Sequence, residues 1–183
     1  MSKNSPFSKG FTLVELLIVI AVLGILASII LVIIDPNAQF AKARNAARKQ
    51  DLRQLQEALD RYKIANGGYP ISPGWCGSWP GTVYSTCGTD WIPGLVASGE
   101  VKKLPQDPLA GKGTVPACAG QSAAWSGYLY YSNGVDFKLL AHCTPEGDAF
   151  PHNGTCTGFA DPFCDPLRPT WAWAVYTPGA VNW

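Results

Sequence analysis

A chain of 183 residues has room for one compact domain and an extension, which excludes two full domains. Charged residues make up 15% of the chain, a low fraction for a soluble protein, while Gly and Pro are frequent, at 19 and 15 residues. The formal net charge is +1, and residues 67–183 hold five basic and eight acidic residues, so no nucleic-acid partner is expected.

Residues 11–34 form one long apolar run, FTLVELLIVIAVLGILASIILVII. As a helix, these roughly 24 residues would extend about 36 Å, enough to cross a hydrocarbon core of about 30 Å. Lys3 and Lys9 precede the run without any acidic residue, which predicts a cytoplasmic N-terminus and a head on the outer side. A cleaved secretory signal is disfavoured, because its apolar core would be only about 7–15 residues long.

Glu15 lies inside the apolar run. A carboxylate at such a depth in a membrane costs about 2.5–3.5 kcal/mol, so it implies a partner. The run contains no Lys, Arg or His. The nearest cation would be a free α-amino group, which exists only if the chain is cut just before Phe11. A plain membrane anchor therefore accounts for the length of the run but not for Glu15.

The sequence KGFTLVELLI at residues 9–18 resembles the class III signal of type IV pilins and type II secretion pseudopilins. The resemblance covers roughly residues 8–34. It implies that a membrane prepilin peptidase cuts between Gly10 and Phe11 and then N-methylates Phe11. It also implies that Glu15 pairs with the N-terminal amine of an adjacent subunit during assembly. Glycine at position 10 would let the protease approach the backbone closely.

Asp35 and Pro36 follow the apolar run. Proline lacks an amide donor and disfavours helix at the preceding residue, so a kink or short break is expected there. In some pilins that this chain resembles, such a proline permits local unwinding inside the filament, and Pro36 is a candidate for that role.

Residues 37–66 predict a helix that continues the first one. An apolar stripe at spacings of three, four and three should pack on the head, and it comprises Leu52, Leu55, Leu59 and Tyr62. Gly67 is available for a left-handed cap after Asn66.

Alternating, β-rich segments dominate the rest of the chain. Residues 127–132 (GYLYYS) and 137–142 (FKLLAH) predict a hairpin, and residues 170–177 (TWAWAVYT) a third strand. Residues 104–108 (LPQDP) are similar to the proline-and-aspartate stretch that precedes the sheet in many pseudopilins. The expected fold is α+β, a long N-terminal helix on a small antiparallel sheet, as in pilins. The expected regions are a leader (1–10), a membrane and filament-core helix (11–34), its amphipathic continuation (35–66) and a head (67–183).

Six cysteines all lie after the apolar run, and no CxxC pair occurs among them. Disulfides formed in an oxidising compartment are the simplest explanation, and zinc is not expected. Six cysteines allow fifteen pairings, which the sequence leaves open. Short loops favour Cys76 with Cys87, Cys118 with Cys143, and Cys156 with Cys164.

Four carboxylates near one another in the sequence raise the possibility of calcium, namely Glu146, Asp148, Asp161 and Asp165. Calcium needs six to eight oxygen ligands, so a solvated loop is the favoured interpretation and no metal or other cofactor is predicted. His142 and His152 are the only histidine bases available, and neither lies in a nucleophile motif. We therefore expect that the protein is not an enzyme.

The leading functional hypothesis is a subunit of a type IV pilus. A pseudopilin of a type II secretion system is the first alternative, and a minor pilin acting in cell adhesion is the second. The expected partners are further copies of the chain, prepilin peptidase, an inner-membrane assembly platform and, before assembly, membrane lipid. The expected location is the inner membrane, with the head outside, and later an extracellular pilus or periplasmic pseudopilus. The basic residues of 36–66, seven against three acidic, face either solvent or the acidic heads of neighbouring copies.

Overall fold

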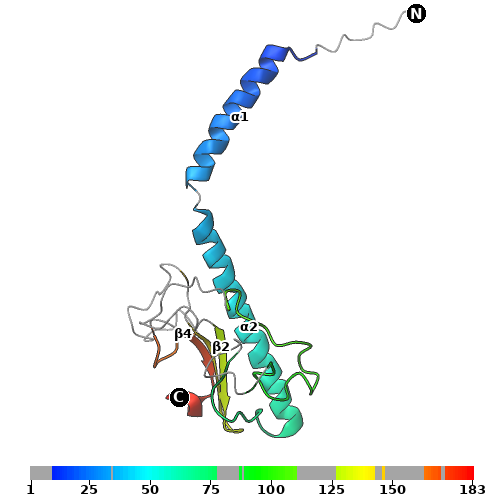
Figure 1. The fold of residues 1–183 in the computed structure, drawn as a ribbon, viewed down its shortest axis with the longest axis vertical. Helices are drawn as coiled ribbons and strands as arrows, with labels where there is room; N and C mark the ends of the chain where they lie inside the picture. Colours follow the sequence, from blue (N-terminus) through cyan, green and yellow to red (C-terminus); the bar gives the residue numbers. More distant parts are fainter. Residues whose placement is uncertain are drawn as a thin grey trace, which may run out of the picture. The chain divides into compact units, whose positions relative to one another are not determined.

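The computed structural model describes residues 10–33, 35–77, 87, 89–110, 127–142, 146, 163–169 and 172–183. The fold is α+β (Figure 1). The chain divides into two compact units, Met1–Gln39 and Phe40–Trp183. The described elements are α1 (Leu13–Ile33), α2 (Pro36–Asn66), β1 (Cys76–Gly77), β2 (Gly127–Ser132), β3 (Phe137–His142), β4 (Ala172–Tyr176) and the short 3-10 helix η3 (Pro178–Ala180).

Helix α1 presents apolar side chains around its whole circumference. Every large apolar side chain from Leu13 to Ile29 is exposed. A helix that is apolar on all sides is stable only when its surroundings are apolar too, so this surface has to be covered from outside its own unit. Within the described ranges, neither helix was found to combine the length and apolar character needed to cross a membrane.

Helix α2 begins with its own capping residue. The Asp35 side-chain Oδ1 accepts hydrogen bonds from the backbone N–H of Asn37 (2.9 Å) and Ala38 (3.4 Å). Pro36 occupies the first helical position, where its missing N–H would have no intrahelical partner in any case. α1 ends at Ile33 and α2 starts at Pro36, so Pro36 starts a helix and does not lie in the middle of one.

The C-terminal end of α2 follows the prediction. The helix ends at Asn66, and Gly67 has a φ of 80°, a left-handed conformation that glycine adopts readily. The Gly67 N–H donates to the Lys63 carbonyl at 2.8 Å. Leu52, Leu55 and Leu59 are buried, as the stripe predicted.

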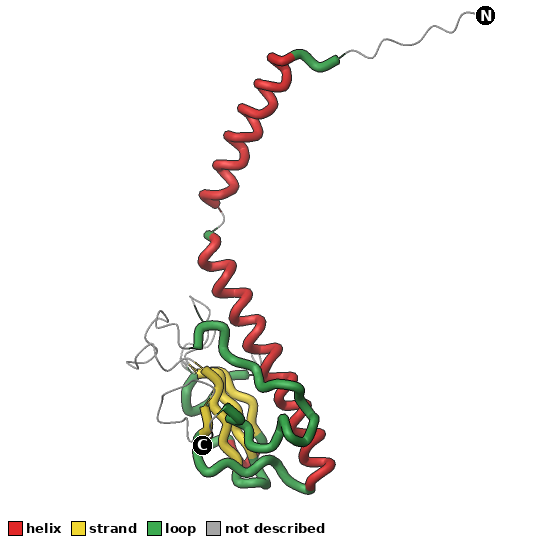
Figure 2. The backbone as a smooth tube through the Cα atoms, turned by 45° about the vertical axis from the view of Figure 1, so that its right-hand side comes forward, coloured by secondary structure: helices red, strands yellow, loops and turns green. Residues whose placement is uncertain are grey.

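The four strands form one antiparallel sheet in the order β1-β2-β3-β4. The β2–β3 hairpin has the predicted boundaries, with Gly127 paired to His142 and Ser132 to Phe137. Figures 1 and 2 show α2 running along the sheet. The main core fills the space between them, with Tyr128, Tyr130, Phe137, Leu139 and Trp173 from the sheet packed on the leucines of α2.

The second face of the sheet is also buried, which explains why β3 has no exposed residue. Leu129, Leu140 and Ala174 form a smaller cluster there, with Trp75 and Tyr176 beside it. The strands are covered on both faces, which favours near-continuous apolar sequences such as FKLLAH.

The loops of the head contain two local features, of which the second, the disulfide between Cys76 and Cys87, matches the sequence analysis. Residues 92–99 form consecutive turns, with hydrogen bonds such as Ser98 N–H to the Gly94 carbonyl at 2.9 Å. Cys76 and Cys87 form a disulfide with Cα atoms 5.5 Å apart. Cys164 is also disulfide-bonded, while Cys118, Cys143 and Cys156 lie outside the described residues.

Candidate processing and assembly site

Gly10 and Phe11 lie immediately before α1, and both are exposed. A Cβ atom added at Gly10 would meet no atom within 4 Å among the described residues. Crowding by the described residues therefore does not require a glycine here.

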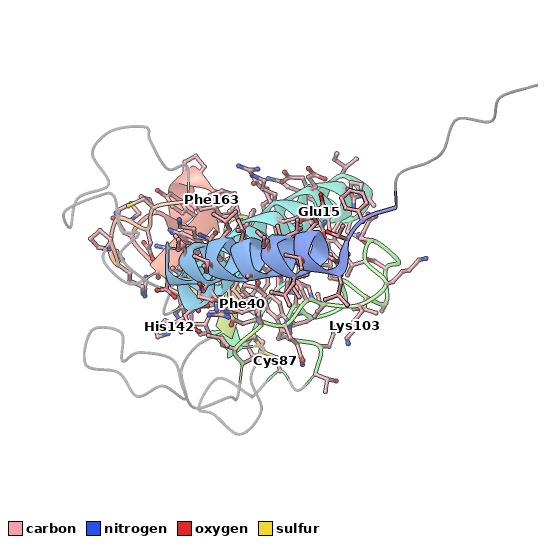
Figure 3. The ribbon with its side chains drawn as sticks, turned by 90° about the horizontal axis from the view of Figure 1, so that it is seen from above. Glu15, Phe40, Cys87, Lys103, His142 and Phe163 are labelled. Carbon is pink, nitrogen blue, oxygen red and sulfur yellow. A yellow bond between two sulfur atoms is a disulfide. The ribbon has the colours of Figure 1, made fainter. Side chains whose placement is uncertain are left out.

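Thr12 and Glu15 form a reciprocal capping box at the start of α1 (Glu15 is labelled in Figure 3). The Thr12 backbone N–H donates to Glu15 Oε2 at 2.9 Å, and the Thr12 hydroxyl donates to the same oxygen at 2.7 Å. In return, the Glu15 N–H donates to Thr12 Oγ1 at 3.2 Å. Each side chain thus satisfies a backbone donor that the first helical turn leaves without a partner.

The capping box gives Glu15 a partner within its own subunit, which the sequence analysis missed. The spacing Thr-x-x-Glu at the start of an apolar run is the signal that identifies it. The negative charge also lies at the positive end of the helix dipole. All contacts of the carboxylate use Oε2, and Oε1 makes no hydrogen bond within the described chain. The box therefore fixes the carboxylate while leaving one oxygen open to a donor from another molecule.

A second polar cluster joins α2 to the head. Its members are Arg44, Asn45, Arg48, Asp107 and Glu146, and we call it the stalk–head clamp. Arg48 is fully buried and binds the Asp107 carboxylate through two nitrogens, with Nη2 to Oδ1 at 2.9 Å. Its Nη1 donates to Glu146, whose other carboxylate oxygen accepts from Arg44 Nε at 2.8 Å. The clamp thus pairs two arginines with two carboxylates.

Asn45 holds the backbone of Glu146. Its side-chain Nδ2 donates to the Glu146 carbonyl at 3.0 Å, and its Oδ1 accepts from the Glu146 N–H at 3.0 Å. Asp107 is held from the head side, because its Oδ1 accepts the Leu109 N–H at 2.8 Å. Two segments distant in sequence are thereby fixed to one stretch of α2.

Burial and the neighbouring charges shift the pKa values of Arg48 and Glu146 in opposite directions. Burial alone would lower the pKa of Arg48, but its hydrogen bonds to Asp107 and Glu146 raise that pKa above the ordinary value. Burial alone would raise the pKa of Glu146, but hydrogen bonds from Arg44 and Arg48 lower it. Arg48 and Glu146 are therefore both charged at neutral pH, and removing one of them would leave a buried charge without its partner.

The proposed calcium ligands that the structure describes are engaged elsewhere. Glu146 belongs to the clamp, and Asp165 is buried and binds Lys138 Nζ at 2.9 Å and Arg168 Nη1 at 3.0 Å. Asp148 and Asp161 lie outside the described residues. Over the described part of the chain, no three His, Cys, Asp or Glu side chains are grouped as a metal site would need. His142 is buried in β3, and His152 is outside the described residues.

Comparison with known proteins supports the N-terminal assignment. Residues 6–31 match the model of the prokaryotic N-terminal methylation motif. The chain is 33% identical over 104 residues to the type II secretion system core protein G of Escherichia coli strain K12, covering 55% of this chain and 66% of the relative.

Other relatives have the same name. The core protein G of Klebsiella pneumoniae is 33% identical over 102 residues, covering 55% of this chain and 68% of the relative. The core protein G of Pseudomonas aeruginosa is 33% identical over 100 residues, covering 55% of this chain and 67% of the relative. No solved structure matches. With this identity over two thirds of a relative's length, the chain belongs to the family of the type II secretion system core protein G.

Proposed function

We propose that the chain is a pseudopilin, a structural subunit that polymerises into the periplasmic filament of a type II secretion system. The observation that carries the proposal is a methylation motif at residues 6–31 in a chain whose relatives are named for type II secretion. These relatives favour the secretion role, which was the first alternative, over the type IV pilus that the sequence analysis put first. The names of these relatives describe a component of a secretion system and state no enzymatic activity.

In this proposal, prepilin peptidase cuts the chain between Gly10 and Phe11 and methylates the new N-terminus. The subunit then waits in the inner membrane through residues 11–34 and is passed to an inner-membrane assembly platform. The membrane stage rests on the apolar sequence of that run. Once extracted, α1 exchanges lipid for the apolar surfaces of other copies, which accounts for its exposed side chains.

Glu15 has a defined part in this assembly. Its Oε2 is held by Thr12, and its Oε1 is open. The amine of Phe11 from an adjacent copy is the cation that fits this oxygen, because pairing the two groups offsets the desolvation of both. The capping box orients the carboxylate before that partner arrives.

A complementation experiment tests the function. The gene for this chain is deleted from its host and restored as the wild type, as Glu15→Ala or as Glu15→Gln. We expect secretion of exoproteins through the type II system to be lost on deletion, restored by the wild type and not restored by Glu15→Ala. N-terminal sequencing of the filament subunit should start at methylated Phe11. Loss of surface pili with secretion unchanged would instead identify a pilus subunit, and a mature chain that keeps residues 1–10 would contradict the processing.

A further inference from the structure

A cleft of about 270 Å³ lies between α2 and the edge strand β4. We call it the α2–β4 cleft, and its lining residues are Arg53, Gln56, Phe163, Ala174, Val175 and Tyr176. Phe163, labelled in Figure 3, is buried and forms part of its wall. The cleft belongs entirely to the unit Phe40–Trp183 and is separate from the Thr12–Glu15 box.

Arg53 brings an uncompensated positive charge to this cleft. Its guanidinium lies 5.1 Å from the centroid of the Phe163 ring, and it forms no ion pair within the described chain. The other arginines of the described head and stalk, Arg44, Arg48, Arg61 and Arg168, all pair with carboxylates. A guanidinium beside an aromatic ring keeps its N–H donors available, and its planar fork of donors suits a carboxylate.

The edge of β4 adds a backbone donor. The Thr177 N–H donates to the Phe137 carbonyl of β3 at 3.1 Å, so the N–H of the preceding residue, Tyr176, points to the opposite edge. The Ala174 N–H points to that edge too, where it donates to the Phe163 carbonyl at 2.6 Å. The Tyr176 N–H has no acceptor within the described residues. Three residues of the cleft lining therefore carry hydrogen-bond donors: the Arg53 guanidinium, the Gln56 side-chain amide and the Tyr176 backbone N–H.

We propose that the α2–β4 cleft binds a carboxylate side chain on the head of a second copy of this chain. The distribution of charge along the chain identifies this occupant. Arg44, Arg48 and Arg61 of the stalk already pair with head carboxylates of their own subunit. Arg53 has no such pair within the described chain, and residues 67–183 carry five basic and eight acidic residues, so the acidic head of another copy attracts it. A contact that joins different surfaces of two copies is heterologous and propagates into a helical filament. This inference rests on the proposed function and adds the partner surface to it.

Charge substitutions in the full chain test the cleft. Filaments are sheared from cells that carry the wild type, Arg53→Glu, Arg53→Lys or the control Lys103→Glu, and the yield is divided by the amount of processed subunit. Lys103, labelled in Figure 3, is exposed and lies outside the cleft lining. We expect Arg53→Glu to lower the yield about fivefold, the ratio for one lost ion pair of about 1 kcal/mol. Arg53→Lys should keep most of the yield, and Lys103→Glu should keep all of it.

Photo-cross-linking identifies the occupant. A photoreactive amino acid replaces Gln56 in the cleft or, as a matched control, Gln54, which is exposed on the same helix but does not line the cleft. In assembled filaments we expect adducts with the mass of two copies from position 56 and far fewer from position 54, with the cross-linked peptide from residues 67–183.

The outcomes separate the inference from the function. A wild-type filament yield from Arg53→Glu would overturn the inference, and so would no adduct at position 56 or an adduct with a different protein. A wild-type chain that forms no filaments and supports no secretion would overturn the proposed function instead.

Discussion

At the scale of single residues, Glu15 is the most informative position in the chain. Its type and depth in the apolar run predict that it needs a partner, and its spacing from Thr12 determines which partner the isolated subunit offers. The structure supplies that partner through two hydrogen bonds to Oε2. The carboxylate that we propose for assembly is thus also the one that caps the helix.

Replacing Thr12 tests the capping role. Thr12→Ala removes the hydroxyl that donates to Glu15 Oε2 and accepts the Glu15 N–H, and it should cost the first turn of α1 about 1 kcal/mol. Faster hydrogen exchange at the backbone amides of residues 13–16, measured by NMR in a lipid mimetic, is the expected result. Thr12→Ser keeps the hydroxyl and should behave as the wild type. Equal exchange in all three proteins would show that the box does not hold the helix start.

At the scale of elements, the side of α2 that faces the head has two halves with different chemistry. Leu52, Leu55 and Leu59 form an apolar contact, and Asn45 and Arg48 continue the same stripe as a polar one. Periodicity alone identifies the leucines. It does not identify Arg48 as a buried residue, because its partners Asp107 and Glu146 lie 59 and 98 positions away. The LPQDP stretch marks Asp107 by resemblance only, and no local pattern marks Glu146.

The clamp predicts a loss of stability in acid. The pKa of Glu146 is lower in the folded protein than its ordinary value of 4.5, so the unfolded chain binds the proton more readily. The stabilisation is therefore complete above about pH 4.5 and is lost as the pH falls through the lower, folded pKa. In thermal melts between about pH 3 and pH 7, Glu146→Gln should be less stable than the wild type by about 1–3 kcal/mol at neutral pH, and the difference should shrink in acid.

Glu57→Gln is the matched control for this titration. Glu57 is exposed on α2 and forms no ion pair within the described residues, so Glu57→Gln removes a carboxylate without breaking a buried contact and should be as stable as the wild type at neutral pH. A Glu146→Gln profile parallel to that of the wild type throughout would show that the clamp does not titrate.

At the scale of the whole molecule, the long N-terminal helix with a break near Pro36 and the antiparallel sheet follow from the sequence. Many of the contacts that hold the head together do not. The strands at residues 127–132 and 137–142 have their predicted boundaries, because a short turn with Asn133 and Gly134 fixes the hairpin locally. Lys138 shows the limit of such reasoning. A lysine in a strand predicts a solvent-facing position, yet it is fully buried against Asp165. The partner comes from a distant loop, and only the tertiary fold brings the two together.

The disulfide between Cys76 and Cys87 fastens the short edge strand β1. A cross-link over a loop of this length typically stabilises a protein by about 2–4 kcal/mol. We expect the double variant Cys76→Ser, Cys87→Ser to lose that amount in denaturant unfolding under oxidising conditions. Adding a reductant to the wild type should lower its stability by at least as much, because the disulfide of Cys164 would open too. A double variant as stable as the wild type would show that β1 does not depend on the bond.

The cap at Asp35 has a practical consequence for producing the head without its apolar helix. Because α2 carries its own N-terminal cap and proline start, a recombinant fragment that opens at Asp35 keeps every hydrogen bond of that first turn. A fragment that opens one residue later loses the cap and should fray. The most economical soluble fragment for crystallisation therefore starts at Asp35.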